Sequence, residues 1–206
     1  HLLVPASRDP TDRRSPHAGD TLDRGYFPKR TRMQVAVVKE TFPGERRVAL
    51  VPAGVSALEK MGARVSIETG AGESAGFADD AYREAGAEIA NNRQQLIAEC
   101  DLWLQVRAAG ANPGGYADDL AQLTDRHTVV GMCDPLGAPQ AISEYAERGV
   151  TLFGMEMLPR ITRAQSMDVL SSMATIAGYK AVLLAADHLP KLFPMMMTAA
   201  GTLTPA

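Results

Sequence analysis

Two arginines, a glutamine, an aspartate and several hydroxyl side chains lie close together in residues 159–172, which read PRITRAQSMDVLSS. No glycine interrupts the chain from there to Gly178, and an apolar run continues to Leu189. Guanidinium, amide, carboxylate and hydroxyl groups are the hydrogen-bonding groups that orient a polar ligand. Residues 159–172 are therefore the first candidate for a binding site.

The spacing within this segment predicts a shared face. Gln165, Asp168 and Ser172 are three and four residues apart, so on a helix they lie side by side. Arg160 precedes them and is placed to fold back onto Asp168 as a charged, hydrogen-bonded pair. A capped helix start with solvated charges has the same pattern, and spacing alone leaves both interpretations open.

Two other polar stretches follow expected strands. Residues 69–76 (TGAGESAG) have the spacing GxGxxxG, which is one residue longer than the dinucleotide fingerprint, and the next helix is expected only at about Asp79. A plain loop is therefore favoured over a phosphate site. In residues 39–50, Arg47 flanks an apolar run near the end of the first strand, and a ligand or interface role for it stays open beside a solvated turn.

The sequence supports neither a metal site nor a hydrolase active site. The four histidines are scattered along the chain: His1, His17, His127 and His188. Isolated histidines at strand starts or helix ends are usually structural, so no metal site is predicted. The sequence contains no GxSxG motif, and no histidine lies near Ser166 or Ser171.

Composition narrows the class of protein. The 206 residues are 46% hydrophobic, enough for a sizeable core. A net charge of −3 and a pI near 5.8 give no sign of nucleic-acid binding. Cys100 and Cys133 lack CxxC spacing and are expected to be buried thiols in a reduced compartment. The longest uninterrupted apolar run, residues 181–186, is too short to span a bilayer.

Short strand-like and helix-like blocks alternate from Met33 onward. The expected strands are residues 33–38, 64–69, 87–90, 101–106, 127–132 and 150–155, and the expected helices are residues 52–61, 79–85, 93–100, 117–124 and 138–148. This alternation predicts an α/β fold with a parallel sheet and helices on both faces. Ligands of such sheets lie beyond the carboxyl ends of the strands, and residues 160–172 follow the last strand.

The chain divides into three expected regions. Residues 1–32 are rich in arginine and proline without apolar periodicity, and we interpret them as a disordered or non-native leader, with Met33 as the start. Residues 33–158 form the α/β domain. Residues 159–206 form a loop and a linker helix.

Three stretches resemble the N-terminal region shared by alanine dehydrogenases and the alpha subunit of proton-translocating nicotinamide nucleotide transhydrogenases. They are residues 33–58 (MQVAVVKETFPGERRVALVPAGVSAL), residues 69–82 (TGAGESAGFADDAY) and residues 159–206. The first two are similar in both enzymes, whereas RITRAQSMDVLSS matches the transhydrogenase. The resemblance implies a Rossmann-like (flavodoxin-like) parallel sheet followed by a long linker helix.

The chemistry of the two enzymes separates them. An alanine dehydrogenase needs a lysine and a histidine near the substrate carbon, and in the family these follow strands that match residues 102–107 and 129–134. Here Gln105 or Arg107 stands in place of the lysine, and His127 precedes the second strand instead of following it. Direct hydride transfer between two nicotinamide rings needs close, dry alignment and no acid or base.

In the transhydrogenase, the loop that resembles residues 160–171 grips the nicotinamide end of NAD(H) and faces NADP(H) on a separate domain. The resemblance implies that Arg160 and Ser171 contact the carboxamide region and that Asp168 orients Arg160 and bonds the ring amide. It also implies that Gln165 reaches toward the NADP(H) ribose. No metal is expected. The implied partners are the NADP(H)-binding and membrane domains and a second copy of the chain, with no nucleic acid.

The implied enzyme is a Re/Si-specific, proton-translocating NAD(P)+ transhydrogenase on the cytoplasmic side of the inner (plasma) membrane, attached through partner domains. In the family a Gly-rich NAD-binding domain follows a segment like residues 198–206, where this sequence stops. We therefore expect the piece alone to be inactive, with little affinity for NADH.

Two alternatives stay open. One is an alanine dehydrogenase-like, NAD-dependent oxidoreductase. The other is a non-catalytic domain kept for subunit contacts, for which the apolar run of residues 176–189 would serve.

Overall fold

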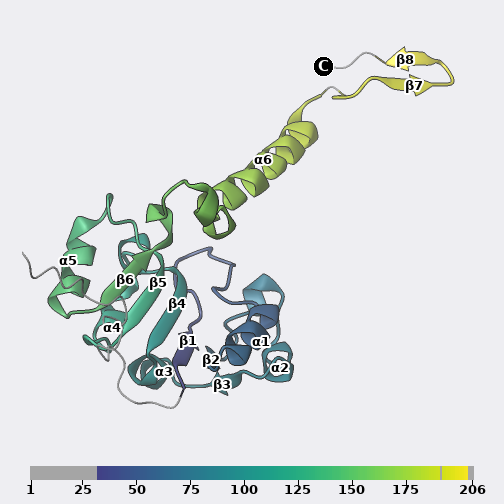
Figure 1. Ribbon diagram of the computed structural model, residues 1–206. Coiled ribbons are helices and arrows are strands. Elements are labelled where there is room, and N and C mark those ends of the chain that lie inside the picture. Colours follow the sequence, from purple (N-terminus) through teal and green to yellow (C-terminus); the bar gives the residue numbers. More distant parts are fainter. Residues whose placement is uncertain (1–31, 191, 204–206) are drawn as a thin grey trace, which may run out of the picture. The chain divides into compact units, whose positions relative to one another are not determined.

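The computed structural model describes residues 32–190 and 192–203, and residues 1–31 of the expected leader lie outside them (Figure 1). The strands are β1 Gln34–Val37, β2 Arg64–Glu68, β3 Glu88–Ala90, β4 Leu102–Arg107, β5 Thr128–Met132, β6 Thr151–Gly154, β7 Met196–Thr198 and β8 Gly201–Leu203. The α-helices are α1 Pro52–Lys60, α2 Asp79–Glu84, α3 Arg93–Glu99, α4 Tyr116–Leu120, α5 Pro139–Glu147 and α6 Val169–His188. Short 3-10 helices are η1 Glu73–Ala75, η2 Ala109–Ala111, η3 Met155–Met157 and η4 Thr162–Met167.

Strands β1 to β6 form one parallel sheet in the order β3-β2-β1-β4-β5-β6. Val35 of β1 pairs with Val65 of β2 on one side and with Leu102 of β4 on the other. The predicted Rossmann-like parallel sheet is therefore confirmed. The strand order is the Rossmann order, whereas a flavodoxin-like sheet would run 2-1-3-4-5, so the flavodoxin-like label does not apply.

Helices cover both faces of the sheet, as the sequence predicts (Figure 1). Val35 and Val37 point into a core that includes Val55 of α1 and Tyr82 of α2. Ala36 and Val38 point into the opposite core, together with residues of α3, α4 and α5. Because β1 is buried on both sides, its sequence is a continuous apolar run instead of an alternating one.

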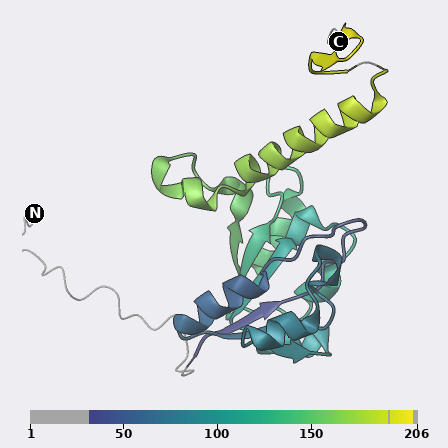
Figure 2. The same ribbon diagram turned by 90° about the vertical axis from the view of Figure 1, so that its right-hand side faces the viewer.

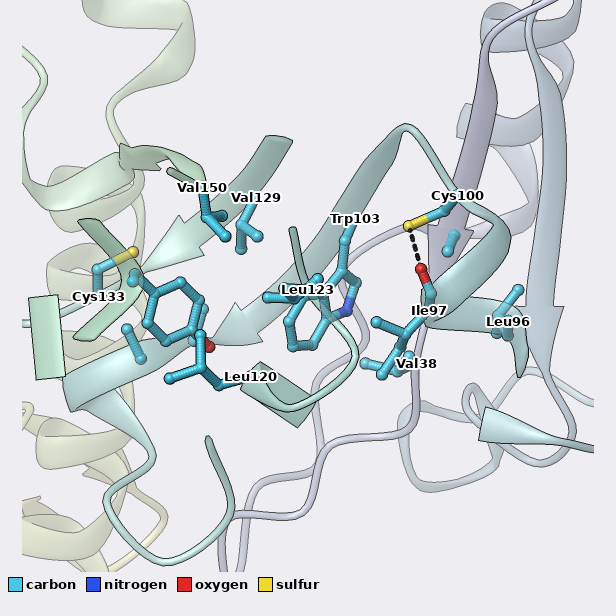
Figure 3. Close-up of a cluster of buried hydrophobic side chains, with 14 residues drawn as sticks. Val38, Leu96, Ile97, Cys100, Trp103, Leu120, Leu123, Val129, Cys133 and Val150 are labelled. Atoms are coloured by element: carbon cyan, nitrogen blue, oxygen red, sulfur yellow. Dashed lines mark hydrogen bonds between the residues drawn. The ribbon is translucent and has the colours of Figure 1, made fainter. Parts of the chain in front are cut away.

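The second core is built around Trp103 of β4, which is fully buried among Val38, Leu120 and Leu123 (Figure 3). The helix expected at residues 117–124 ends earlier, at Leu120, yet Leu123 is still buried in the turn that follows. Packing rather than helix periodicity therefore accounts for the apolar residue at position 123.

Both cysteines are buried free thiols, as predicted. The thiol of Cys100 donates a hydrogen bond of 3.2 Å to the carbonyl oxygen of Ile97 (Figure 3). Burial raises the pKa of Cys100 and of Cys133 to about 12, so both stay protonated at neutral pH.

The long helix α6 is apolar around its whole circumference, and nearly all of its side chains are exposed. It is one uninterrupted helix (Figure 2). By length and composition, α6 could cross a membrane, which the count of unbroken apolar residues did not reveal. Core helices of soluble proteins meet the same criterion. The antiparallel hairpin of β7 and β8 beyond it was not predicted either.

Candidate functional site

The segment singled out in the sequence, residues 159–172, begins shortly after the end of β6. The chain passes through η3 and then η4, and α6 starts at Val169 with Asp168 as its N-cap. The segment therefore lies beyond the carboxyl end of an edge strand, the side of a parallel sheet on which ligands bind.

A cavity of about 520 Å³ opens in this segment. Its lining includes all four predicted site residues and is formed by Pro159, Arg160, Ile161, Ala164, Gln165, Asp168, Ser171, Ser172 and Thr175. The structure therefore brings Arg160, Gln165, Asp168 and Ser171 together around one space, although η4 is a 3-10 helix and only Ser171 lies in α6.

Asp168 holds the start of α6. Its carboxylate accepts hydrogen bonds from the amides of Leu170 (3.0 Å) and Ser171 (2.9 Å) and from the hydroxyl of Ser171 (2.6 Å). The hydroxyl of Ser171, followed by these amides, lowers the pKa of Asp168, so its carboxylate is ionised at neutral pH. The capped helix start that the spacing left open is thus present.

Arg160 and Gln165 keep their side-chain donors available. Within residues 32–190 and 192–203, no hydrogen bond or ion pair joins Arg160 to Asp168, so the expected pair is not seen. The charge of Arg160 only contributes to the lowered pKa of that carboxyl. Both side chains are exposed, and neither the guanidinium of Arg160 nor the side-chain amide of Gln165 has a hydrogen-bond partner among the described residues.

A second, mostly apolar cavity of about 380 Å³ adjoins the first, because Ser172 lines both. It lies beside the ends of β4 and β5, and its lining includes Arg47, Met132, Met155 and Met173. Arg47, for which a ligand or interface role was open, thus borders a cavity.

The guanidinium of Arg47 is nevertheless fixed by Glu45. Its Nε and NH2 groups donate to the two carboxylate oxygens of Glu45 at 2.8 and 2.7 Å. Glu45 also accepts a 3.0 Å bond from Arg107, whose guanidinium lies 4.0 Å from the centre of the Phe42 ring. These bonds, with Arg47 first, hold the pKa of Glu45 down at about 2. Arg107, which the sequence offers together with Gln105 in place of the alanine dehydrogenase lysine, is ion-paired with Glu45.

At the crevice between β1 and β4, where the strand order reverses, a side chain from the loop after β1 bonds to the backbone of β4. The carboxylate of Glu40 accepts the amides of Val106 (2.7 Å) and Arg107 (3.1 Å). Burial raises the pKa of Glu40. In dinucleotide-binding Rossmann sheets this crevice receives the ligand. Sequence reasoning missed Glu40, because its partners lie 66 and 67 residues away.

In the glycine-rich loop of residues 69–76, backbone and side-chain donors are bonded to another residue of the chain. The carboxylate of Asp79 accepts the hydroxyl of Thr69 (2.7 Å) and the amide of Gly70 (2.9 Å). A Cβ at Gly72 would lie 2.6 Å from the Tyr82 ring, so this glycine is required for packing. These contacts support the interpretation of residues 69–76 as a plain loop.

His127 has a structural role at the opposite end of the strands, directly before β5. It is buried, its Nδ1 accepts the amide of Thr124 at 2.9 Å, and burial lowers its pKa. In the described portion of the chain, no three His, Cys, Asp or Glu residues are grouped to hold a metal ion.

Comparison with known proteins identifies the family to which the chain belongs. The family model described as "Alanine dehydrogenase/PNT, N-terminal domain" matches residues 36–177, more than half of the chain. The chain belongs to this family. The resemblance seen in the sequence is thereby confirmed.

Within the alanine dehydrogenase/PNT family, transhydrogenases are the more similar relatives. An NAD(P) transhydrogenase alpha-subunit polypeptide of Rhodospirillum rubrum is 41% identical over 175 residues, covering 84% of this chain and 45% of that protein. The crystal structure of the transhydrogenase from Sinorhizobium meliloti has 41% identity and a TM-score of 0.73, covering 84% of this chain and 50% of that one.

The alanine dehydrogenase of Bacillus subtilis is more distant. It is 32% identical over 162 residues, covering 77% of this chain and 39% of that protein. The chain thus spans half or less of the length of each of these relatives.

Proposed function

We propose that this chain belongs to a proton-translocating, Re/Si-specific NAD(P)+ transhydrogenase, in which it holds the nicotinamide end of NAD(H). The observation that carries the proposal is the cavity in which Arg160, Gln165, Asp168 and Ser171 meet. The greater similarity to transhydrogenase subunits than to alanine dehydrogenase supports it.

The lining suits a carboxamide group. Arg160 and Gln165 offer donors without partners among the described residues, and Asp168 and Ser171 offer acceptor oxygens that are already oriented by the helix cap. An arginine is charged and a glutamine is neutral at any working pH, and Asp168 stays ionised because its pKa is lowered. The charge of the site therefore does not change near pH 7.

NAD(H) bound here would supply a hydride that passes directly to NADP+ on a partner domain, with no proton exchanged at the reacting carbons. Arg160 and Ser171 would hold the carboxamide region, and Gln165 would reach toward the NADP(H) ribose. Asp168 would accept from the ring amide while it fixes the start of α6. The task of these residues is alignment and exclusion of water.

The same proposal gives the chain its place in a larger assembly. Residues 33–158 would be the Rossmann-like domain, and residues 159–206 the nicotinamide-facing loop and the linker to an NAD-binding domain. The partners would be NADP(H)-binding and membrane domains and a second copy of the subunit, with this domain on the cytoplasmic side of the membrane.

The test uses the full-length subunit assembled with its NADP(H)-binding and membrane domains. The proposal predicts hydride transfer from NADH to an NADP analogue and no NADH oxidation that depends on pyruvate. Pyruvate-dependent oxidation without transhydrogenation would establish the alanine dehydrogenase reaction instead. Absence of both activities would favour a domain for subunit contacts.

A further inference from the structure

Glu156 ties the candidate site to the body of the sheet. It lies in η3, directly after the edge strand β6, and its carboxylate oxygen Oε1 accepts the backbone amides of Cys133 (2.6 Å) and Asp134. These two amides follow the last residue of β5. One carboxylate therefore joins the chain after β6 to the turn after β5.

The turn is shaped to present both amides to one oxygen. Asp134 has a φ of +48°, a left-handed conformation that is uncommon for residues other than glycine. Its own carboxylate accepts the amide of Gly137 at 3.2 Å, which closes the turn. Without Glu156, the amides of Cys133 and Asp134 would lose their acceptor.

The second carboxylate oxygen of Glu156 is enclosed. Among the described residues, Oε2 is buried and has no hydrogen-bond partner. A Cβ on Gly154 would lie 3.2 Å from this oxygen. A buried acceptor without a partner has a cost, and the charged bonds from Oε1 to the two amides offset it.

The residues on either side of Glu156 line the two cavities. Met155, immediately before it, lines the apolar cavity, and Arg160, four positions later, lines the polar one. Pro159 limits the backbone freedom of the short stretch between them. The position of Arg160 thus depends on where η3 is held.

We propose that Glu156 is a positioning residue, which sets the location of Arg160 by clamping η3 to the amides of Cys133 and Asp134. The clamp itself rests on geometry alone, whereas its effect on hydride transfer rests on the proposed function.

Glu40 provides a matched control. Its carboxylate also accepts two consecutive amides of a neighbouring strand, those of Val106 and Arg107 at the end of β4, but it comes from the loop after β1 and not from the segment that carries Arg160. Glu156→Ala and Glu40→Ala each remove the acceptor oxygens of a pair of amides. A general loss of stability would affect both variants, whereas displacement of Arg160 would follow only the first.

The first measurement is limited proteolysis by trypsin of this chain, with cleavage after Arg160 and Arg163 compared with cleavage after Arg83 in α2. Glu156→Ala is expected to raise the ratio several-fold, and Glu40→Ala to leave it unchanged. If Glu156→Ala does not fold, Glu156→Asp, which keeps the charge but shortens the reach, is expected to raise the same ratio. An unchanged ratio in a folded Glu156 variant overturns the clamp.

The second measurement is hydride transfer in the assembled enzyme at saturating NADH, with Arg160→Ala run in parallel. Glu156→Ala is expected to lower the maximal rate about tenfold or more, because misplacement of a binding group by about 1 Å has effects of this size, while Glu40→Ala keeps the rate. A loss of rate in Arg160→Ala but not in Glu156→Ala overturns the positioning role. If Arg160→Ala is itself without effect, the proposed function fails, and the trypsin ratio still decides whether the clamp exists.

Discussion

The hydroxyl of Ser171 donates a 2.6 Å hydrogen bond to the carboxylate of Asp168, and both residues line the candidate site. The same carboxylate accepts the first amides of α6. The start of the helix and the wall of the cavity are therefore made of the same atoms. A change at Asp168 alters helix capping and ligand contacts together.

Substitutions of Asp168 separate these two tasks. Asparagine is a good N-cap, so Asp168→Asn is expected to keep the amides of Leu170 and Ser171 protected from hydrogen exchange while it removes the charge. Asp168→Ala removes both the N-cap acceptor and the charge, so hydrogen exchange of the Leu170 and Ser171 amides should become faster. Equal exchange in the alanine variant and the unchanged chain would show that the cap contributes nothing to the helix start.

The pattern of residues predicted the sheet well, because buried parallel strands such as β1 are short apolar runs with recognisable ends. Helix starts were also readable, since Pro52 and Pro139 stand in the first turns of α1 and α5. The strand order could not be predicted from the sequence, because it depends on pairings between residues that are distant in the chain, such as Val35 with Leu102.

Glu45 is expected to make stability depend on pH. Its pKa is about 2 in the folded chain and near 4.5 when unfolded, so its contribution is present in full above about pH 4.5 and is lost as the pH falls toward 2. Glu45→Gln should lower the free energy of unfolding at pH 7 by about 1–3 kcal/mol. In urea titrations the difference from the unchanged chain should shrink between pH 5 and pH 3. A difference that stays constant over this range would contradict the assignment.

Gly131 lies in β5 directly beside the backbone of Gln105 in β4. A Cβ there would lie 2.3 Å from the carbonyl oxygen of Gln105, an atom that cannot move without disturbing the sheet. Gly131→Ala is therefore expected to reduce the free energy of unfolding by about 1–3 kcal/mol. The control is Gly114→Ala, where the new methyl group meets no atom within 4 Å. Equal unfolding midpoints for the two variants would refute the close approach.

The candidate site was predicted incompletely. Arg160, Gln165, Asp168 and Ser171 were named from composition and resemblance, and the structure places all four around one cavity. The roles of Glu40 and Glu156 were not found from the sequence. The amide partners of Glu40 lie at least 66 residues away and those of Glu156 at least 22 residues away. A single glutamate after a strand also carries no local signal. The pairing of Arg160 with Asp168 was expected from sequence proximity, but Asp168 is used by the helix cap instead.

Arg160 is the residue on which the proposed grip on the nicotinamide depends most. The most direct test is the rate of hydride transfer from NADH to an NADP analogue in the assembled enzyme, for Arg160→Ala and for Arg163→Ala, whose arginine is also exposed but does not line the cavity. Loss of a charged hydrogen bond predicts a rate about 10- to 100-fold lower for Arg160→Ala, and a rate within about twofold of the unchanged enzyme for Arg163→Ala. Equal rates for the two variants would contradict the role of Arg160 in holding the nicotinamide.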